Sequence, residues 1–161
     1  MKERCHICGR KMKEGLDQCK VCNAPPDEQV VLACQAAHNV NFLVNPFVNL
    51  ILTDRRLLVF EDMSVVGGQA TFQGGLVGSL VGLAADKVVE KTIGANGSLK
   101  LDIPLTAVQG VETEDKQKKG TQMILNLAAG KISKFTVSRE MADPSAPGGQ
   151  LIGMLKRTAE G

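Results

Sequence analysis

Short runs of apolar residues, each bounded by polar or turn-forming residues, recur through the chain after residue 28. Such runs of Val, Leu and Ile are typical of β-strands. Because several short strands at near-regular spacing predict a barrel or sandwich, we expect a mainly β fold with little helix. The predicted strands are Val30–Ala36, Val48–Thr53, Leu57–Glu61, Leu99–Ile103, Val108–Glu114, Met123–Leu127 and Ile132–Val137.

Turn signals separate several of these strands. Asp54-Arg55-Arg56 lies between two apolar runs, and Ala128 to Lys131 carries a glycine between two others. Both segments predict β-hairpins. The sequence EDKQKKG, residues 114–120, predicts a third hairpin tip. Its lysines Lys116, Lys118 and Lys119 adjoin two carboxylates, which favours a solvated turn over a binding patch.

The pattern changes to a helical period near the end of the chain. Leu151, Ile152 and Leu155 fall on one face of a helix. Pro144 and Pro147 precede this segment, and proline is tolerated at a helix start. We expect one amphipathic helix that covers an open end of the barrel.

A glycine-rich stretch at residues 74–91 does not fit a strand. Gly75, Gly78, Gly82 and Ala85 would form one small-residue stripe on a helix, and such stripes let helices approach closely. Three interpretations stay open for this inserted helix. It packs within the chain, it makes a homo-oligomer or partner contact through Gly75, Gly78 and Gly82, or it enters a bilayer surface.

Four cysteines occupy the sequence CHICGRKMKEGLDQCKVC, residues 5–22. Two Cys-x-x-Cys pairs ten residues apart are typical of a structural zinc site, with Cys5, Cys8, Cys19 and Cys22 as the ligands of one Zn²⁺. Gly9 and Asn23 follow the two pairs, where the backbone turn often needs a positive φ. Gly15 predicts a turn in the spacer, and His6 is expected to face solvent. Metal binding should supply most of this segment's folding energy.

The cysteine spacing resembles the short N-terminal zinc ribbons of many bacterial proteins, over residues 1 to about 24. Such ribbons bind nucleic acid in some proteins and protein partners in others. Residues 1–24 carry six basic and three acidic residues and no aromatic residue. One Zn²⁺ and four thiolates would reduce the formal charge of +3 to +1. A nucleic-acid module usually has a basic face with stacking aromatics, so a protein partner is the favoured interpretation.

The sequences NLILTDRRLLVF (49–60) and IPLTAVQGVE (103–112), with the later hairpin and closing helix, resemble bacterial PH-like domains of the GRAM-related type. This resemblance implies a seven-stranded, strongly bent sheet capped by a C-terminal helix. It implies binding of partners or lipids, with no enzyme activity. Residues 35–46 carry no Lys or Arg, although lipid-binding PH domains place basic residues in this loop; His38 alone is a poor substitute. The expected organisation is a ribbon at 1–24, a linker at 25–28 and a PH-like domain at 29–161.

Composition limits the remaining choices. The formal net charge of +2 gives no strong attraction to nucleic acid or membrane. No secretory signal precedes the cysteines, so we expect a cytoplasmic protein. The uncharged run Met63 to Ala85 is too interrupted by polar residues and glycine to span a bilayer. No catalytic constellation is found, and Cys34 reads as a small buried residue.

The expected function is therefore a non-enzymatic binding or adaptor module that mediates protein–protein contacts. Two alternatives remain. In the first, the PH-like domain or the glycine-rich helix contacts a membrane surface. In the second, which the charge disfavours, the ribbon binds nucleic acid.

Overall fold

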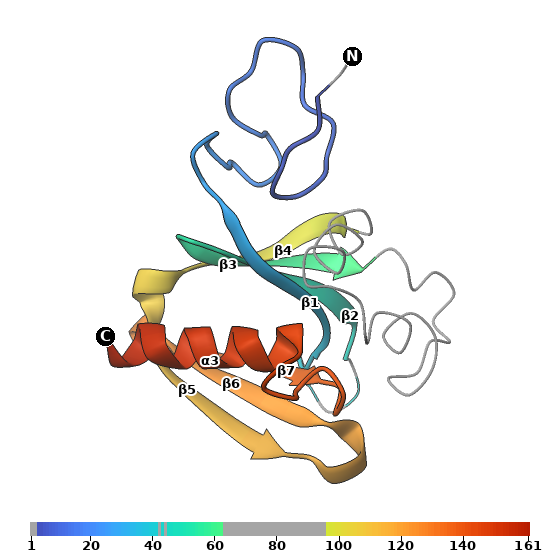
Figure 1. Cartoon of the computed structure of the whole chain (residues 1–161), viewed down its shortest axis with the longest axis vertical. Helices are drawn as coiled ribbons and strands as arrows, with labels where there is room; N and C mark the ends of the chain where they lie inside the picture. Colours follow the sequence, from blue (N-terminus) through green and yellow to red (C-terminus); the bar gives the residue numbers. More distant parts are fainter. Residues whose placement is uncertain (1–2, 42, 44, 63–95) are drawn as a thin grey trace.

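The computed structural model describes residues 3–41, 43, 45–62 and 96–161. Figure 1 shows an N-terminal loop region, a β-sheet and one C-terminal helix. The glycine-rich stretch 74–91 lies outside the described residues. Its predicted helix and the predicted contacts of Gly75, Gly78 and Gly82 therefore stay predictions.

Seven antiparallel strands form one sheet, in the order β4-β3-β2-β1-β7-β6-β5. Each predicted strand is present, with ends that differ by up to three residues. The edge strands β4 and β5 do not pair with each other, so the sheet is not closed. The strands are β1 (Val30–His38), β2 (Phe47–Thr53), β3 (Arg56–Asp62), β4 (Asn96–Pro104), β5 (Val108–Asp115), β6 (Thr121–Leu127) and β7 (Ile132–Val137).

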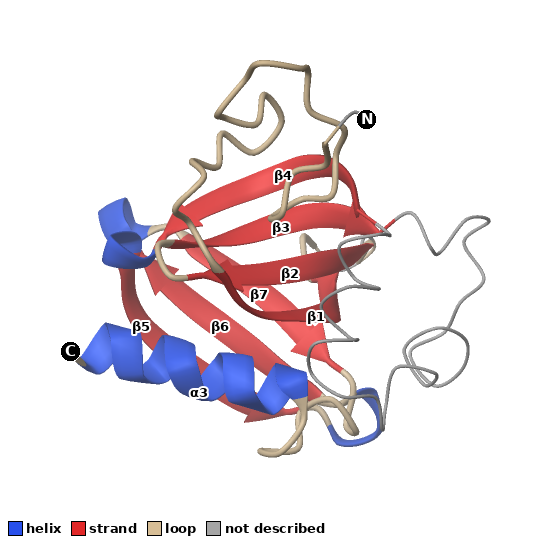
Figure 2. Cartoon of the chain, turned by 45° about the horizontal axis from the view of Figure 1, so that its top comes forward, coloured by secondary structure: helices blue, strands red, loops and turns tan. Residues whose placement is uncertain are grey.

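The sheet bends where β1 meets β7. Only two residue pairs join these strands, Ala37 with Thr136 and His38 with Phe135. Figure 2 shows that β5, β6 and β7 run at a steep angle to β3 and β4. The mainly β class with a bent seven-stranded sheet is thereby confirmed.

The predicted hairpins are also present. β2 pairs with β3 around Asp54 and Arg55, and β6 pairs with β7 around residues 128–131. A short 3₁₀ turn, Gln117–Lys119, joins β5 to β6 at the predicted tip. Two further 3₁₀ turns, Leu105–Ala107 and Ala128–Gly130, follow β4 and β6.

The C-terminal helix α3 (Pro147–Glu160) begins with Pro147 in its first turn and covers one side of the bent sheet, against β5 and β1 (Figure 1). The predicted apolar residues Leu151, Ile152 and Leu155 are its buried face. They enter a core with alternate residues of all the strands. Among the described residues, the helices are too short and too polar to cross a membrane.

Candidate metal centre

The structure brings together the four cysteines that the sequence singles out. The Sγ atoms of Cys5, Cys8, Cys19 and Cys22 all lie within 4.8 Å of one another, and all four residues are buried. Cys5 Sγ lies 3.6 Å from Cys22 Sγ, and Cys8 Sγ lies 3.6 Å from Cys19 Sγ. These distances are far longer than a disulfide bond of about 2.05 Å. A tetrahedral ion with metal–sulfur bonds of about 2.3 Å needs sulfurs about 3.8 Å apart, so the cluster fits one metal ion.

The backbone repeats one local geometry at both cysteine pairs. Ile7 N donates to Cys5 Sγ and Val21 N donates to Cys19 Sγ, each at 3.4 Å. Gly9 N bonds to Cys5 O, and Asn23 N bonds to Cys19 O. Gly9 has φ of 73° and Asn23 has φ of 55°, as predicted from their positions. Each pair thus forms a tight turn whose N–H groups point at sulfur, which favours the thiolate form.

The rest of the segment closes around these turns. Arg4 and Lys11 form an isolated antiparallel bridge on either side of the first turn. The spacer reverses direction at Gly15, which has φ of 80°. The isolated bridge therefore lies across the first cysteine pair, while Gly15 makes the turn that the sequence predicts.

The thiols of Cys5, Cys8 and Cys22 shift one another's pKa. Hydrogen bonds with Cys22 and Cys8 hold the pKa of Cys5 well below its usual range. Hydrogen bonds with Cys5 and Cys8, together with burial, raise the pKa of Cys22. Because like charges this close repel strongly, further thiolates become stable only when a cation joins them. The cluster is therefore chemically suited to binding a metal and unsuited to standing as four free thiolates.

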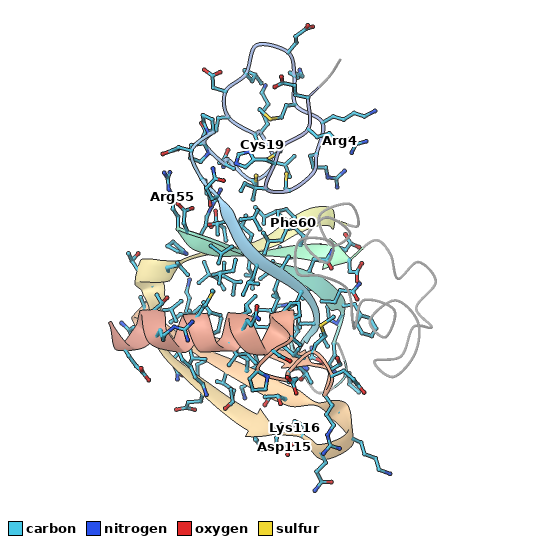
Figure 3. The ribbon with its side chains drawn as sticks, viewed as in Figure 1. Arg4, Cys19, Arg55, Phe60, Asp115 and Lys116 are labelled. Atoms are coloured by element: carbon cyan, nitrogen blue, oxygen red, sulfur yellow. The ribbon has the colours of Figure 1, made fainter. Side chains whose placement is uncertain are left out.

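The segment that contains the four cysteines, residues 3–24, is called the metal-binding segment here, and it packs directly onto the outer face of the sheet. One apolar cluster contains the four cysteines, Ile7 and Ala24 together with Ala33, Ile51, Leu58 and Phe60 of the sheet. Ile7 and Phe60 are both fully buried. Figure 3 shows Phe60 on the side of the sheet that faces the segment containing Cys19. Burying side chains of this size stabilises the contact by about 1.5–3 kcal/mol each.

A buried ion pair attaches the linker to the β2–β3 turn. Arg56 Nε and Nη2 donate to the two carboxylate oxygens of Glu28, each at 2.9 Å, and Arg56 Nη1 donates to Asp102 at 2.7 Å. Thr53 Oγ1 also donates to Glu28, at 2.6 Å. The Glu28 side chain is only 1% exposed. Burial alone would raise the pKa of Glu28, but its bonds from Arg56 and Thr53 prevail and lower it.

The neighbouring residues strengthen this attachment. Asp27 pairs with Arg55, and Gln29 exchanges hydrogen bonds with Asp54 through its N–H and carbonyl groups. The Leu-Thr-Asp and Arg-Arg residues that the sequence presents as a turn motif thus serve as the anchor for the linker. Residues 27–29 are fixed to the sheet at several points.

The remaining single residues match their predicted environments in part. His6 is exposed and stays apart from the four sulfurs, but its Nε2–H donates to Glu28 O. Cys34 is fully buried in the main core, and burial raises its pKa to about 12. His38 lies at the end of β1 and stacks on Phe135 with ring centroids 4.9 Å apart; burial lowers its pKa.

Sequence reasoning missed the contact between the metal-binding segment and the sheet. Ile7, Ile51, Leu58 and Phe60 carry it, and none stood out as a functional residue. A signal was present in the continuous apolar runs of β2 and β3. A strand with one solvent face alternates apolar and polar residues, whereas a strand buried on both faces does not.

No protein-family model matches the chain, and a comparison with curated proteins gives no significant match. The structure therefore defines the class by itself: a bent seven-stranded antiparallel sheet with a C-terminal helix and a four-cysteine cluster able to bind one metal ion.

Proposed function

We propose that the chain is a non-enzymatic binding module in which a structural zinc ribbon is fixed to a PH-like domain and presents a surface to a protein partner. The observation that carries this proposal is the closed, buried cluster of four cysteines docked on the sheet. Four protein ligands leave no open coordination position for a substrate. The ion then serves to shape the ribbon.

Zinc is the metal that this donor set favours. Thiolate ligands in a tetrahedral arrangement select zinc or an iron–sulfur cluster among the common metals, and the sulfur spacing suits a single ion. The seven-stranded bent sheet with its C-terminal helix supports the resemblance to PH-like domains. Because no family model matches the chain, its membership of the PH-like family is a proposal.

The ribbon's surface is better suited to protein than to nucleic acid. Leu16 and Val21 are partly exposed large apolar residues of the ribbon. The segment has no aromatic residue to stack on bases, and its charge is close to neutral once a metal is bound. Apolar side chains surrounded by polar residues are typical of protein interfaces.

The proposal is tested by affinity capture with the purified, zinc-loaded chain, followed by quantitative mass spectrometry. We expect a specific partner whose recovery falls at least about tenfold with Leu16→Ser/Val21→Ser, because the loss of two apolar contacts costs more than about 1.4 kcal/mol. The matched control is Val31→Ser/Ile132→Ser, which changes two exposed apolar residues outside the ribbon.

A partner that is recovered equally with both double variants would show that the ribbon is not the contact surface. Binding of labelled DNA or RNA at low salt, lost on replacing Lys11 and Lys13, would replace the protein-partner proposal with nucleic-acid binding. Zinc content is measured on the same preparations. A metal other than zinc, or none, would contradict the assignment of the ion.

A further inference from the structure

Strand β7 has an open edge beyond the end of β1. β6 pairs with β7 along its whole length, from Ile132 to Val137. β1 pairs with β7 at only two positions, where Ala37 meets Thr136 and His38 meets Phe135. The first residues of β7 therefore continue past the end of β1 without a neighbouring strand on that side.

The backbone of β7 turns its hydrogen-bonding groups alternately to its two sides. Leu127 N donates to Lys131 O, on the β6 side. Lys134 O accepts from Asn39 N, on the β1 side. Because the side alternates from one residue to the next, Ile132 also faces the β1 side. Within the described part of the chain, the N–H and C=O of Ile132 and the N–H of Lys134 have no hydrogen-bond partner.

A cavity of about 870 Å³ lies along this edge. Ile132 and Lys134 line it, together with the loop that follows β1 and the β5–β6 turn. Gln122 Nε2 and Thr136 Oγ1 donate to Asn39 Oδ1, at 3.1 and 2.7 Å. These bonds hold the start of the loop against β6 and β7, so the open edge and its cavity exist before any partner binds.

The charged side chains around the cavity are all basic. Lys116 and Lys119 come from the β5–β6 turn and Lys134 from β7, and none of the lining residues is acidic. Lys116 pairs with Glu114, whereas Lys119 and Lys134 have no ion pair among the described residues. Lysines on a strand edge repel the same edge of a second copy, and they favour a partner of negative charge. Figure 3 shows Lys116 at the opposite end of the molecule from Cys19.

From these observations we propose that an extended acidic segment of a protein partner adds to the open edge of β7 as a further strand. The segment bonds to the N–H and C=O of Ile132, the two groups that one residue exchanges with an antiparallel neighbour. Its carboxylates lie against Lys119 and Lys134, and an apolar side chain packs on Val40, which lines the cavity and is 55% exposed.

A peptide segment fits this site because it offers a regular row of backbone donors and acceptors, which the edge of β7 lacks on that side. The site is at the other end of the molecule from the contact proposed for the ribbon. The chain would therefore have two separate protein contacts, and the β7 contact is specific for an acidic, extended sequence.

The first test is selection from a display library of random octapeptides on the full-length, zinc-loaded chain. We expect enriched peptides to carry Asp or Glu at alternate positions, because alternate residues of a strand face the same side. Proline should be depleted, since it has no N–H to donate to the Ile132 carbonyl. The ribbon variant Leu16→Ser/Val21→Ser should select the same acidic peptides, which separates this site from the ribbon contact.

One pair of variants tests the backbone bond itself. Ile132→Pro removes an N–H that β6 does not use, and Lys131 before it has φ of −74° and ψ of 145°, an extended geometry compatible with a following proline. Ile132→Ser loses the same apolar side chain but keeps the N–H. We expect an enriched peptide to bind Ile132→Pro about fivefold more weakly than Ile132→Ser, the usual effect of one hydrogen bond. Thermal melts confirm that both variants fold.

Lysine variants test the role of charge. Lys119→Gln/Lys134→Gln should weaken peptide binding at least about fivefold at low salt, and added salt should reduce this difference. Lys100→Gln/Lys118→Gln is the matched control, because it removes the same charge from lysines that do not line the cavity. Its effect should be much smaller.

Hydrogen exchange shows where an enriched peptide lies. Exchange of the Ile132 and Lys134 amides should slow at least about tenfold in the complex, because both become hydrogen-bonded. The Phe135 amide faces β6, so its exchange should stay unchanged and serves as the internal control.

Three results would overturn the proposal. The first is a selection that yields no acidic peptides. The second is equal binding of the enriched peptides to Ile132→Pro and Ile132→Ser, with no slowed exchange at Ile132 and Lys134, which would show that charge alone attracts them. The third is flotation with vesicles that contain phosphatidylglycerol while no enriched peptide binds. The cavity would then face a membrane surface and not a protein.

Discussion

Cysteines of this chain perform different tasks according to their surroundings. Cys22 and Cys34 are both fully buried cysteines. Cys22 touches another sulfur at 3.6 Å, whereas Cys34 lies among aliphatic side chains of the main core. Proximity to other soft donors, and not burial, makes a cysteine a metal ligand.

Replacing each of these two cysteines by serine therefore gives a matched comparison. Cys22→Ser should reduce bound metal from one ion per chain to a small fraction at nanomolar free zinc. Cys34→Ser should keep one ion per chain while lowering the free energy of unfolding by about 1–3 kcal/mol, the cost of burying a hydroxyl among apolar groups. Metal content by mass spectrometry and denaturant melts measure the two effects. Equal metal loss in both variants would contradict the assigned ligands.

Glu28 is the residue on which the linker depends. Replacing it by glutamine leaves Arg56 buried with a single carboxylate partner, Asp102. We expect a loss of about 3 kcal/mol, the usual cost of breaking a buried ion pair. Because the pKa of Glu28 is lowered in the folded chain, its contribution is fully present above its unfolded pKa, near 4.5, and is lost as the pH falls through the folded value.

Urea melts at a series of pH values test this expectation. The difference in unfolding free energy between the wild type and Glu28→Gln should be constant above about pH 5 and should shrink on further acidification. Asp27→Asn is the control, because its pair with Arg55 lies at the surface, where an ion pair contributes little to stability. A Glu28→Gln difference that does not depend on pH would show that its carboxylate charge is not involved.

At the scale of elements, the strands and the closing helix could be predicted because their patterns are local. The spacing of Leu151, Ile152 and Leu155 is enough to predict a helix. The contact of Phe60 with the ribbon could not be predicted in this way. Phe60 and Ile7 are 53 positions apart in the chain, and nothing in either local pattern identifies its partner.

A cavity beside the β1–β2 loop, lined in part by Asn39, Lys119 and Lys134, escaped prediction for the same reason. Lys119 and Lys134 come from a turn and a strand that meet Asn39 only after the sheet bends at β1 and β7. The β1–β2 loop itself has no basic residue, and the lysines that line the cavity belong to other elements. Which other elements lie beside a loop is decided by the order of strands in the sheet, which the sequence pattern leaves open.

The start of helix α3 gives a prediction at this scale. A Cβ added to Gly149 would lie 2.0 Å from Asp143 O, whereas one added to Gly153 would meet nothing nearer than the Arg157 side chain at 3.5 Å. Alanine is favoured over glycine within a helix by about 1 kcal/mol. Gly153→Ala should therefore raise the unfolding free energy by about 0.5–1 kcal/mol, and Gly149→Ala should lower it.

Thermal and denaturant melts of both variants decide this point. The pair controls for helix propensity, because each change adds one methyl group to the same helix. A stabilising effect of Gly149→Ala would show that the loop at Asp143 moves aside without cost. The close approach of that loop to the helix would then contribute nothing to stability.

At the scale of the whole molecule, the ribbon and the sheet share one apolar cluster. Removing the metal should therefore also lower the stability of the sheet. Losing the burial of Phe60 alone removes about 2–3 kcal/mol, and 1 kcal/mol shifts the melting temperature of a chain this size by about 2–4 °C. A chelator should therefore lower the melting temperature of the sheet by about 5–10 °C. Binding of a dye specific for exposed apolar surface should increase at the same time.

Phe60→Ala provides the comparison for this prediction. It should lower the melting temperature of the metal-loaded chain, and a chelator should then cause a smaller further decrease, because the two changes disrupt the same contact. Additive effects of chelator and substitution would show that the ribbon and the sheet unfold independently. Acidification should also release the metal, since protons compete for the thiolates.

The cover that the ribbon places over Phe60 has a consequence for synthesis on the ribosome. The four cysteines span only residues 5–22 and leave the ribosome before β2 and β3. Their turns close over short stretches of chain, which is fast compared with pairing distant strands. The ribbon would already be folded around its ion when Ile51, Leu58 and Phe60 leave the ribosome, and these residues could pack against it at once. It would shield this apolar surface from neighbouring nascent chains and from chaperones, so that the supply of the bound metal would set the yield of the protein in the cell.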